Sequence, residues 1–149
     1  MKIIKTIFFS GLIAGTLDAI AAIILFARPA SLHKISGVFR YIASGLFGKT
    51  AYTSGFIYPL SGLILHYLIA LAWSAIYLLI FCRVFRSGFV WAKTIFLASL
   101  IWITMNGFVM PICGLNSAHY DGWSVMRSFL VLLLCVGLPI CLITEKRSI

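Results

Sequence analysis

Four polar side chains in otherwise apolar stretches have the chemistry to hold a small solute or a proton. They are a carboxylate, an imidazole, an amide and a guanidinium, carried by Asp18, His66, Asn106 and Arg127. The chain has only three acidic residues, yet one stands inside the apolar run of residues 10–26. A carboxylate near the centre of a membrane helix costs about 2.5–3.5 kcal/mol on insertion scales. Because such groups usually face a bundle interior or a wet cavity, we expect Asp18 to point away from lipid.

Composition indicates which elements position these side chains. The chain has 149 residues, of which 62% are hydrophobic and 10% charged, and its mean hydropathy is +1.11. A soluble domain needs more polar residues to cover its surface. The length suits one compact unit, so we expect residues 1–149 to form a single transmembrane domain.

Four apolar segments are long enough to cross about 30 Å of hydrocarbon as helices. They cover approximately residues 6–27, 59–81, 90–113 and 124–143. The first could be a signal peptide, since it follows Lys2 and Lys5 and contains small residues. Its apolar run continues past those small residues, which favours a retained helix. The predicted fold is therefore all-α, a four-helix membrane bundle.

Helical spacing predicts which faces meet. In the first segment Gly11, Gly15 and Asp18 share one stripe, and in the second Gly62 and His66 share another. The G-x-x-x-G spacing of Gly11 and Gly15 lets helix backbones approach closely. We therefore predict these three glycines as helix-packing positions.

Depth favours one cluster of the four polar groups. Asp18 lies about 14 Å from the outer end of its helix, and His66 and Asn106 about 10 Å from the outer ends of theirs. Arg127 begins the fourth span on that side and could reach inward. The cluster could form a solute or proton site, or it could merely join helices through hydrogen bonds of about 0.6 kcal/mol each. Both interpretations remain open from the sequence.

Basic residues set the expected orientation. The formal net charge is +9, but the bases flank apolar runs, where they act as topology signals and not as a nucleic-acid surface. The third connection, residues 114–123, has no Lys or Arg, unlike the N-terminus, the second connection and the C-terminus. This contrast favours both termini in the cytoplasm. The first connection carries Arg28, Lys34, Arg40 and Lys49 and runs against the trend.

That first connection also contains an amphipathic helix pattern over residues 34–48. Its apolar residues recur at helical spacing: Ile35, Val38, Phe39, Ile42, Leu46 and Phe47. Such a helix would anchor on the membrane surface or cover a cavity as a lid. Both uses are consistent with the pattern.

Other signatures are weak. Residues 43–50, "ASGLFGKT", match a relaxed Walker A pattern, but no strand can precede them in so short a connection, which makes nucleotide binding unlikely. None of the four cysteines forms C-x-x-C or stands at zinc spacing from a histidine. We expect no metal, no cofactor and no enzymatic activity, since no nucleophile–base pair is recognisable.

Three segments carry a resemblance to a known group of proteins. "GLIAGTLDAIAA", "VFRYIASGLFGKTAY" and "HYLIALAWSAIY" resemble the YagU-like family, small bacterial inner-membrane proteins of unknown function. The likeness covers approximately residues 11–77. It implies a four-helix protein of the bacterial inner membrane and supplies no reaction and no site residues.

Two functions are consistent with these observations. The first is binding or passage of a small solute or proton at the polar cluster, in a homo-oligomer. The second is a non-catalytic accessory subunit of a membrane complex, in which the small-residue stripes contact a membrane protein partner and the polar cluster is structural. In both cases we expect the lipid bilayer to surround the chain.

Overall fold

The computed structural model describes residues 2–27, 31–81, 89–115 and 121–148, and every regular element in these ranges is helical. Four helices are long and apolar enough to cross a membrane: Lys2–Phe26, Ile57–Phe81, Val90–Ile112 and Gly122–Lys146. The prediction of an all-α chain with four such helices is therefore confirmed. Three of the helices begin two to four residues earlier than predicted, and the third in chain order begins at the predicted residue.

Only the first of these long helices is α-helical throughout. The others each contain a π-helical turn, in which backbone hydrogen bonds skip one residue more than in an α-helix. The first long helix is α1 (Lys2–Phe26), and the second is α3 (Ile57–Ile76) followed by a π turn (Tyr77–Phe81). The third consists of α5 (Val90–Thr104), a π turn (Met105–Val109) and α6 (Met110–Ile112). The fourth consists of α7 (Gly122–Val131), a π turn (Leu132–Gly137) and α8 (Leu138–Ser148).

Two of the π turns end two residues before a proline. Met110 N–H donates to the carbonyl of Met105, and Leu138 N–H donates to that of Leu133, one residue further back than in an α-helix. A proline ring clashes with the carbonyl four residues before it. The wider turn accommodates Pro111 and Pro139 and lets both helices continue.

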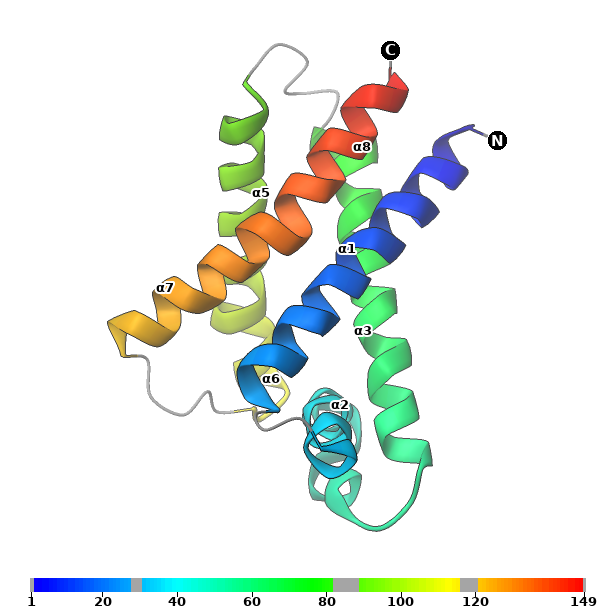
Figure 1. Ribbon diagram of the computed structural model, residues 1–149, viewed down its shortest axis with the longest axis vertical. Coiled ribbons are helices and arrows are strands. Elements are labelled where there is room, and N and C mark those ends of the chain that lie inside the picture. Colours follow the sequence, from blue (N-terminus) through cyan, green and yellow to red (C-terminus); the bar gives the residue numbers. More distant parts are fainter. Residues whose placement is uncertain (1, 28–30, 82–88, 116–120, 149) are drawn as a thin grey trace.

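The two termini lie at the same end of the molecule, and α2 lies at the opposite end (Figure 1). The long helices run up and down between these ends, with α1 packed against α3 and against α8. Helix α2 (Leu32–Phe47) is seen almost end-on in this view, so it runs across the bundle and not along it.

Helix α2 packs tightly against α3 through a glycine. A β-carbon added at Gly62 would lie 1.8 Å from the backbone oxygen of Phe39, so only glycine fits there. The start of α2 is fixed by Ser31, whose side chain accepts a hydrogen bond from the Lys34 amide. The contact between Gly62 and the backbone of Phe39 holds α2 across the end of α3.

Arg40 holds the chain that follows α2. Its guanidinium donates to the carbonyl oxygens of Ala51 at 2.9 Å and Gly55 at 2.7 Å, and also to that of Thr53. These carbonyls belong to the short 3₁₀ helix Gly48–Tyr52 and the turn after it. Arg40 therefore satisfies backbone groups that the turn leaves without partners.

Helices α1 and α3 pack closely at two glycines. A β-carbon at Gly11 would lie 3.0 Å from the Cα of Leu71, and one at Gly15 would lie 3.1 Å from the β-carbon of Ala70. At the same interface the hydroxyls of Ser10 and Ser74 share a 2.6 Å hydrogen bond. Small side chains thus let two backbones meet and exchange polar contacts.

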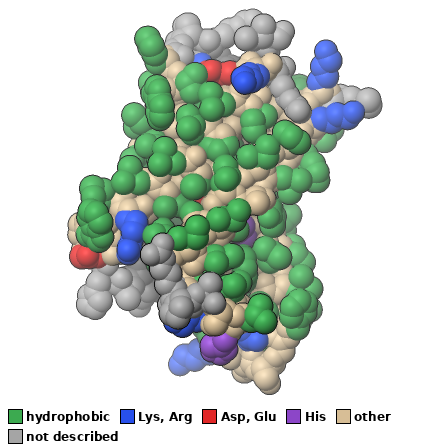
Figure 2. All heavy atoms as spheres, viewed as in Figure 1, with side chains coloured by type: hydrophobic (Ala, Val, Ile, Leu, Met, Phe, Trp, Pro, Cys, Tyr) green, Lys and Arg blue, Asp and Glu red, His purple; other side chains and the backbone are tan. Residues whose placement is uncertain are grey.

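The outer surface along the long helices is mainly hydrophobic, and lysine and arginine side chains gather towards the two ends (Figure 2). Large apolar side chains are exposed on every long helix, among them Phe8, Ile20, Ile64, Leu68, Ile103 and Leu134. A solvent-facing surface of this kind is unfavourable, whereas lipid tails cover it without cost.

The contact at Gly62 makes a testable prediction. Replacing Gly62 with alanine should lower the stability of the purified protein by about 1–3 kcal/mol, because the new methyl group collides with backbone and not with a movable side chain. Thermal unfolding in detergent would measure this change. The matched control is Gly37→Ala in α2, where nothing lies within 4 Å of an added β-carbon and alanine should instead stabilise the helix by up to about 1 kcal/mol. Equal stability of the two variants would contradict the packing of α2 on α3.

Candidate functional site

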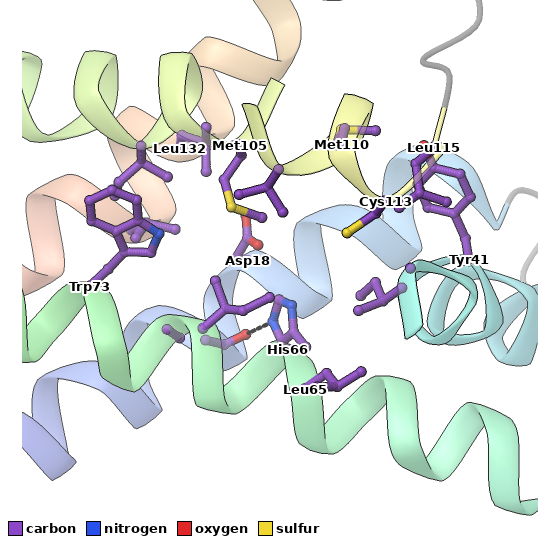
Figure 3. A pocket seen from close by; sticks show the side chains of 18 of the residues that line it. Asp18, Tyr41, Leu65, His66, Trp73, Met105, Met110, Cys113, Leu115 and Leu132 are labelled. Atoms are coloured by element: carbon purple, nitrogen blue, oxygen red, sulfur yellow. Dashed lines mark hydrogen bonds between the residues drawn. The ribbon is translucent and has the colours of Figure 1, made fainter. Parts of the chain in front are cut away.

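A cavity of about 380 Å³ lies between the long helices at the end covered by α2 (Figure 3). Its wall includes residues from α1, α2, α3, the α5–α6 segment and the π turn Leu132–Gly137. All four long helices therefore contribute. Its size lies within the range of cavities that hold small molecules, about 300–1,000 Å³.

Asp18 is the only charged side chain among the described residues that line this cavity. It is partly buried, and its carboxylate accepts no hydrogen bond from a described residue. Its electrostatic neighbour is His66. A carboxylate in an apolar wall that accepts nothing from the described residues can accept hydrogen bonds from a bound molecule.

His66 lines the same cavity and is held by α1. Its Nε2 lies 2.8 Å from the carbonyl oxygen of Gly15. A carbonyl oxygen only accepts, so Nε2 carries the proton and donates it. In the neutral form of the ring, Nδ1 is then an acceptor. The position of the ring is set further by an edge-to-face contact with Tyr67, whose hydroxyl shares a 3.0 Å hydrogen bond with Thr16.

Asn106 and Arg127 do not line the cavity, so the structure brings together only two of the four polar residues of the sequence cluster. The amide of Asn106 donates to the carbonyl of Trp102, one turn back in its own helix, at 3.0 Å. Arg127 lies on α7, partly exposed. The buried residues of α5 include the apolar Leu97, Ala98 and Ile101.

Hydrogen bonding explains where the polar face of α5 lies. The indole Nε1 of Trp102 donates to the hydroxyl of Ser128 on α7 at 3.1 Å, so this polar face meets a neighbouring helix and not the cavity. Beyond it the π turn shifts the register of the helix. The side chains of Met105, Val109, Met110 and Cys113 then line the cavity.

Helix α2 closes one end of the cavity with Tyr41, Ile42, Gly45 and Leu46. A β-carbon on Gly45 would lie 3.6 Å from the Sγ of Cys113, in ordinary contact, so α2 meets the end of the α5–α6 segment here. Of the two uses considered for this segment, covering a cavity has direct geometric support.

The Walker-like residues 43–50 end a helix instead of preceding one. Gly48 follows α2 with φ +57°, and its amide donates back to the carbonyl of Ser44. A phosphate-binding loop instead presents free amides at the start of a helix. Gly48 is thus a helix-ending residue, and nothing lies within 4 Å of a β-carbon added there.

One polar contact was missed by the sequence interpretation. Lys93 and Glu145 form an ion pair at 2.5 Å between the first turn of α5 and the last turns of α8. Lys93 is only 8% exposed, although its position near the second connection suggested a free topology signal. The rarity of acids in this chain was the available clue, because a lone Glu145 needs a basic partner.

No group of three metal-ligating side chains occurs in the part of the chain that the structure describes. The cysteines within the described ranges, Cys113, Cys135 and Cys141, are free thiols, and Cys141 is fully buried. Cys82 and His119 lie outside those ranges.

Comparison of the chain with protein-family models, with curated proteins and with solved structures finds no match. The chemistry of the cavity must therefore be inferred from its own residues.

The cavity predicts a difference between two thiols. A small membrane-permeant thiol reagent should modify Cys113, which lines the cavity, much faster than Cys141, which is fully buried. Mass spectrometry of protein digested after timed labelling would assign each product to its cysteine. Unfolding in denaturant is the control, since it should make both thiols react at similar rates. A Cys113 as unreactive as Cys141 in the folded protein would contradict an accessible cavity.

Proposed function

We propose that this chain is an integral membrane protein that binds or passes a small solute or a proton, with Asp18 and His66 as the polar groups of the site. The observation that carries the proposal is the cavity of about 380 Å³ between all four long helices, with Asp18 as its only charged described lining residue. A protein that merely joins helices would place its acid against a donor from another helix. Here the carboxylate accepts no hydrogen bond from a described residue.

The cost of Asp18 supports the same proposal. The predicted span 6–27 contains eleven Leu, Ile and Phe residues, which contribute about −3 to −6 kcal/mol to insertion. The helix therefore tolerates a carboxylate but gains nothing from it in stability. An ionisable group kept at such a cost is characteristic of solute and proton pathways.

We propose the bacterial inner membrane as the location, with both termini in the cytoplasm. In support, Lys2, Lys5 and Lys146 lie on helices at the end that holds both termini. Helix α2 would then lie at the outer surface, where Leu32 and Leu46, both largely exposed, contact the lipid interface while Lys34 meets head groups. A solute would enter the cavity beside α2.

The alternative of an accessory subunit loses part of its basis. It required the small-residue stripes to contact another protein, but Gly11 and Gly15 pack against α3, and Gly62 packs against α2. Gentle extraction from native membrane followed by affinity purification separates the two functions. Recovery of the chain alone, as a defined homo-oligomer, would support the solute site, and stoichiometric recovery of a different membrane protein would support the accessory function.

Substitution of the site tests the proposal directly. Asp18→Asn keeps the size of the side chain and removes the charge, so we expect a folded yield in detergent close to that of wild type and a loss of the growth or transport phenotype. His66→Ala should also lose activity, with a modest destabilisation of about 0.6–1.7 kcal/mol from the lost bond to Gly15.

The matched control is Asp121→Asn, because Asp121 is an exposed acid outside the cavity. It should retain both fold and activity. A folded and fully active Asp18→Asn protein would sink the proposal. Failure of both Asp18→Asn and His66→Ala to fold would instead support a purely structural role for the pair.

A further inference from the structure

The cavity wall indicates the chemical class of its ligand, an inference that rests on the proposed function. Apart from Asp18 and His66, the wall is made almost entirely of apolar and aromatic side chains. None of the lysines and arginines in the described ranges lines it. A solute that binds here must therefore bury apolar surface and must also satisfy one acidic group.

The two polar groups both offer acceptors. The Asp18 carboxylate has no donor among the described residues. His66 directs its Nε2–H at the carbonyl of Gly15, and in the neutral form of the ring the remaining Nδ1 accepts. This pair of acceptors fits a ligand that brings N–H donors to it. The Trp73 indole and the Tyr41 hydroxyl also line the wall, away from the pair.

The charge of the Asp18 carboxylate favours some hydrogen-bond donors on the ligand over others. A carboxylate in a low-dielectric wall interacts more strongly with a cation than it would in water. An ammonium supplies both the positive charge and several N–H donors, and its hydrogen bond to a carboxylate is about twice as strong as a neutral one. An alcohol of the same shape supplies one neutral donor, and a carboxylate supplies only repulsion.

The position of the pair limits the shape of the ligand. Asp18 and His66 lie in the middle of the cavity, with Trp73 on one side and Tyr41 and Cys113 on the other (Figure 3). A bound ammonium at the pair would have an aromatic or aliphatic body against Trp73 or against α2. We propose that the cavity binds a small lipophilic primary or secondary amine as its ammonium, with N–H groups directed at Asp18 and at Nδ1 of His66.

Three probes of similar shape test this proposal: phenethylamine, 2-phenylethanol and 3-phenylpropanoate. Each is added to the purified full-length protein, and protection of Cys113 from a thiol reagent reports occupancy, because Cys113 lines the same cavity. We expect phenethylamine to protect at concentrations at least tenfold lower than the other two. Its N,N,N-trimethyl derivative keeps the charge but has no N–H donor, and it should protect at least tenfold less well than phenethylamine.

Variants distinguish binding of a probe at the site from partitioning of the probe into detergent. In Asp18→Asn the advantage of phenethylamine over 2-phenylethanol should disappear, whereas Asp121→Asn should retain it, since that acid lies outside the cavity. The comparison of probes on wild-type protein stands without any variant, should Asp18→Asn fail to fold.

The outcomes distinguish this inference from the proposed function. Equal protection by the alcohol and the amine would overturn the amine proposal and leave a cavity that holds apolar solutes or lipid chains. Strongest protection by 3-phenylpropanoate would also overturn it and indicate a cationic His66. Protection by none of the probes, with no shift in unfolding temperature, would count against both the amine and the solute cavity.

Discussion

The close approach of α1 and α3 is the contact on which the rest of the structure depends. Gly11 and Gly15 bring the two backbones together because no side chain separates them. At that distance the His66 ring reaches the carbonyl of Gly15, and the hydroxyls of Ser10 and Ser74 meet. The first of these bonds orients the ring beside Asp18. A larger residue at position 15 would therefore do more than loosen a helix pair, because it would displace the imidazole from the acid.

The same interface explains how the chain keeps a cavity in a small bundle. Four helices of spanning length would normally close on each other through apolar side chains. Here α1 contributes mainly small residues to its buried face, and α2 fills the end of the bundle crosswise, held by Gly62 and Arg40. Space remains between them, and the acid of α1 borders that space instead of a neighbouring helix.

Sequence reasoning went furthest where a single periodicity decides the outcome. Apolar runs of spanning length predicted the four long helices, and the stripes on the first two segments carry Asp18 and His66, which the structure places on one cavity wall. It did not succeed for Asn106 on the third segment, which the depth argument placed with Asp18 and His66 and which does not line the cavity. Trp102 and Asn106 bond to Ser128 and to their own helix backbone, which a periodicity cannot show. The Lys93–Glu145 pair joins residues 52 positions apart, a pairing that only the folded arrangement of α5 and α8 reveals.

The π turn of Met105–Val109 makes the cavity wall sensitive to the insertion or deletion of a single residue. A π turn accommodates about one residue more than an α-helix of the same rise, and each residue of an α-helix rotates the next by about 100°. Deleting one residue there would restore regular α geometry and rotate α6 relative to α5, turning Met110 and Cys113 away from the space that they now border. A one-residue insertion or deletion in this helix could thus add or remove part of the cavity wall, with no change in the hydrophobicity of the helix. Two versions of this chain, with and without the extra residue, would differ in the shape of the cavity while their hydropathy profiles stayed alike.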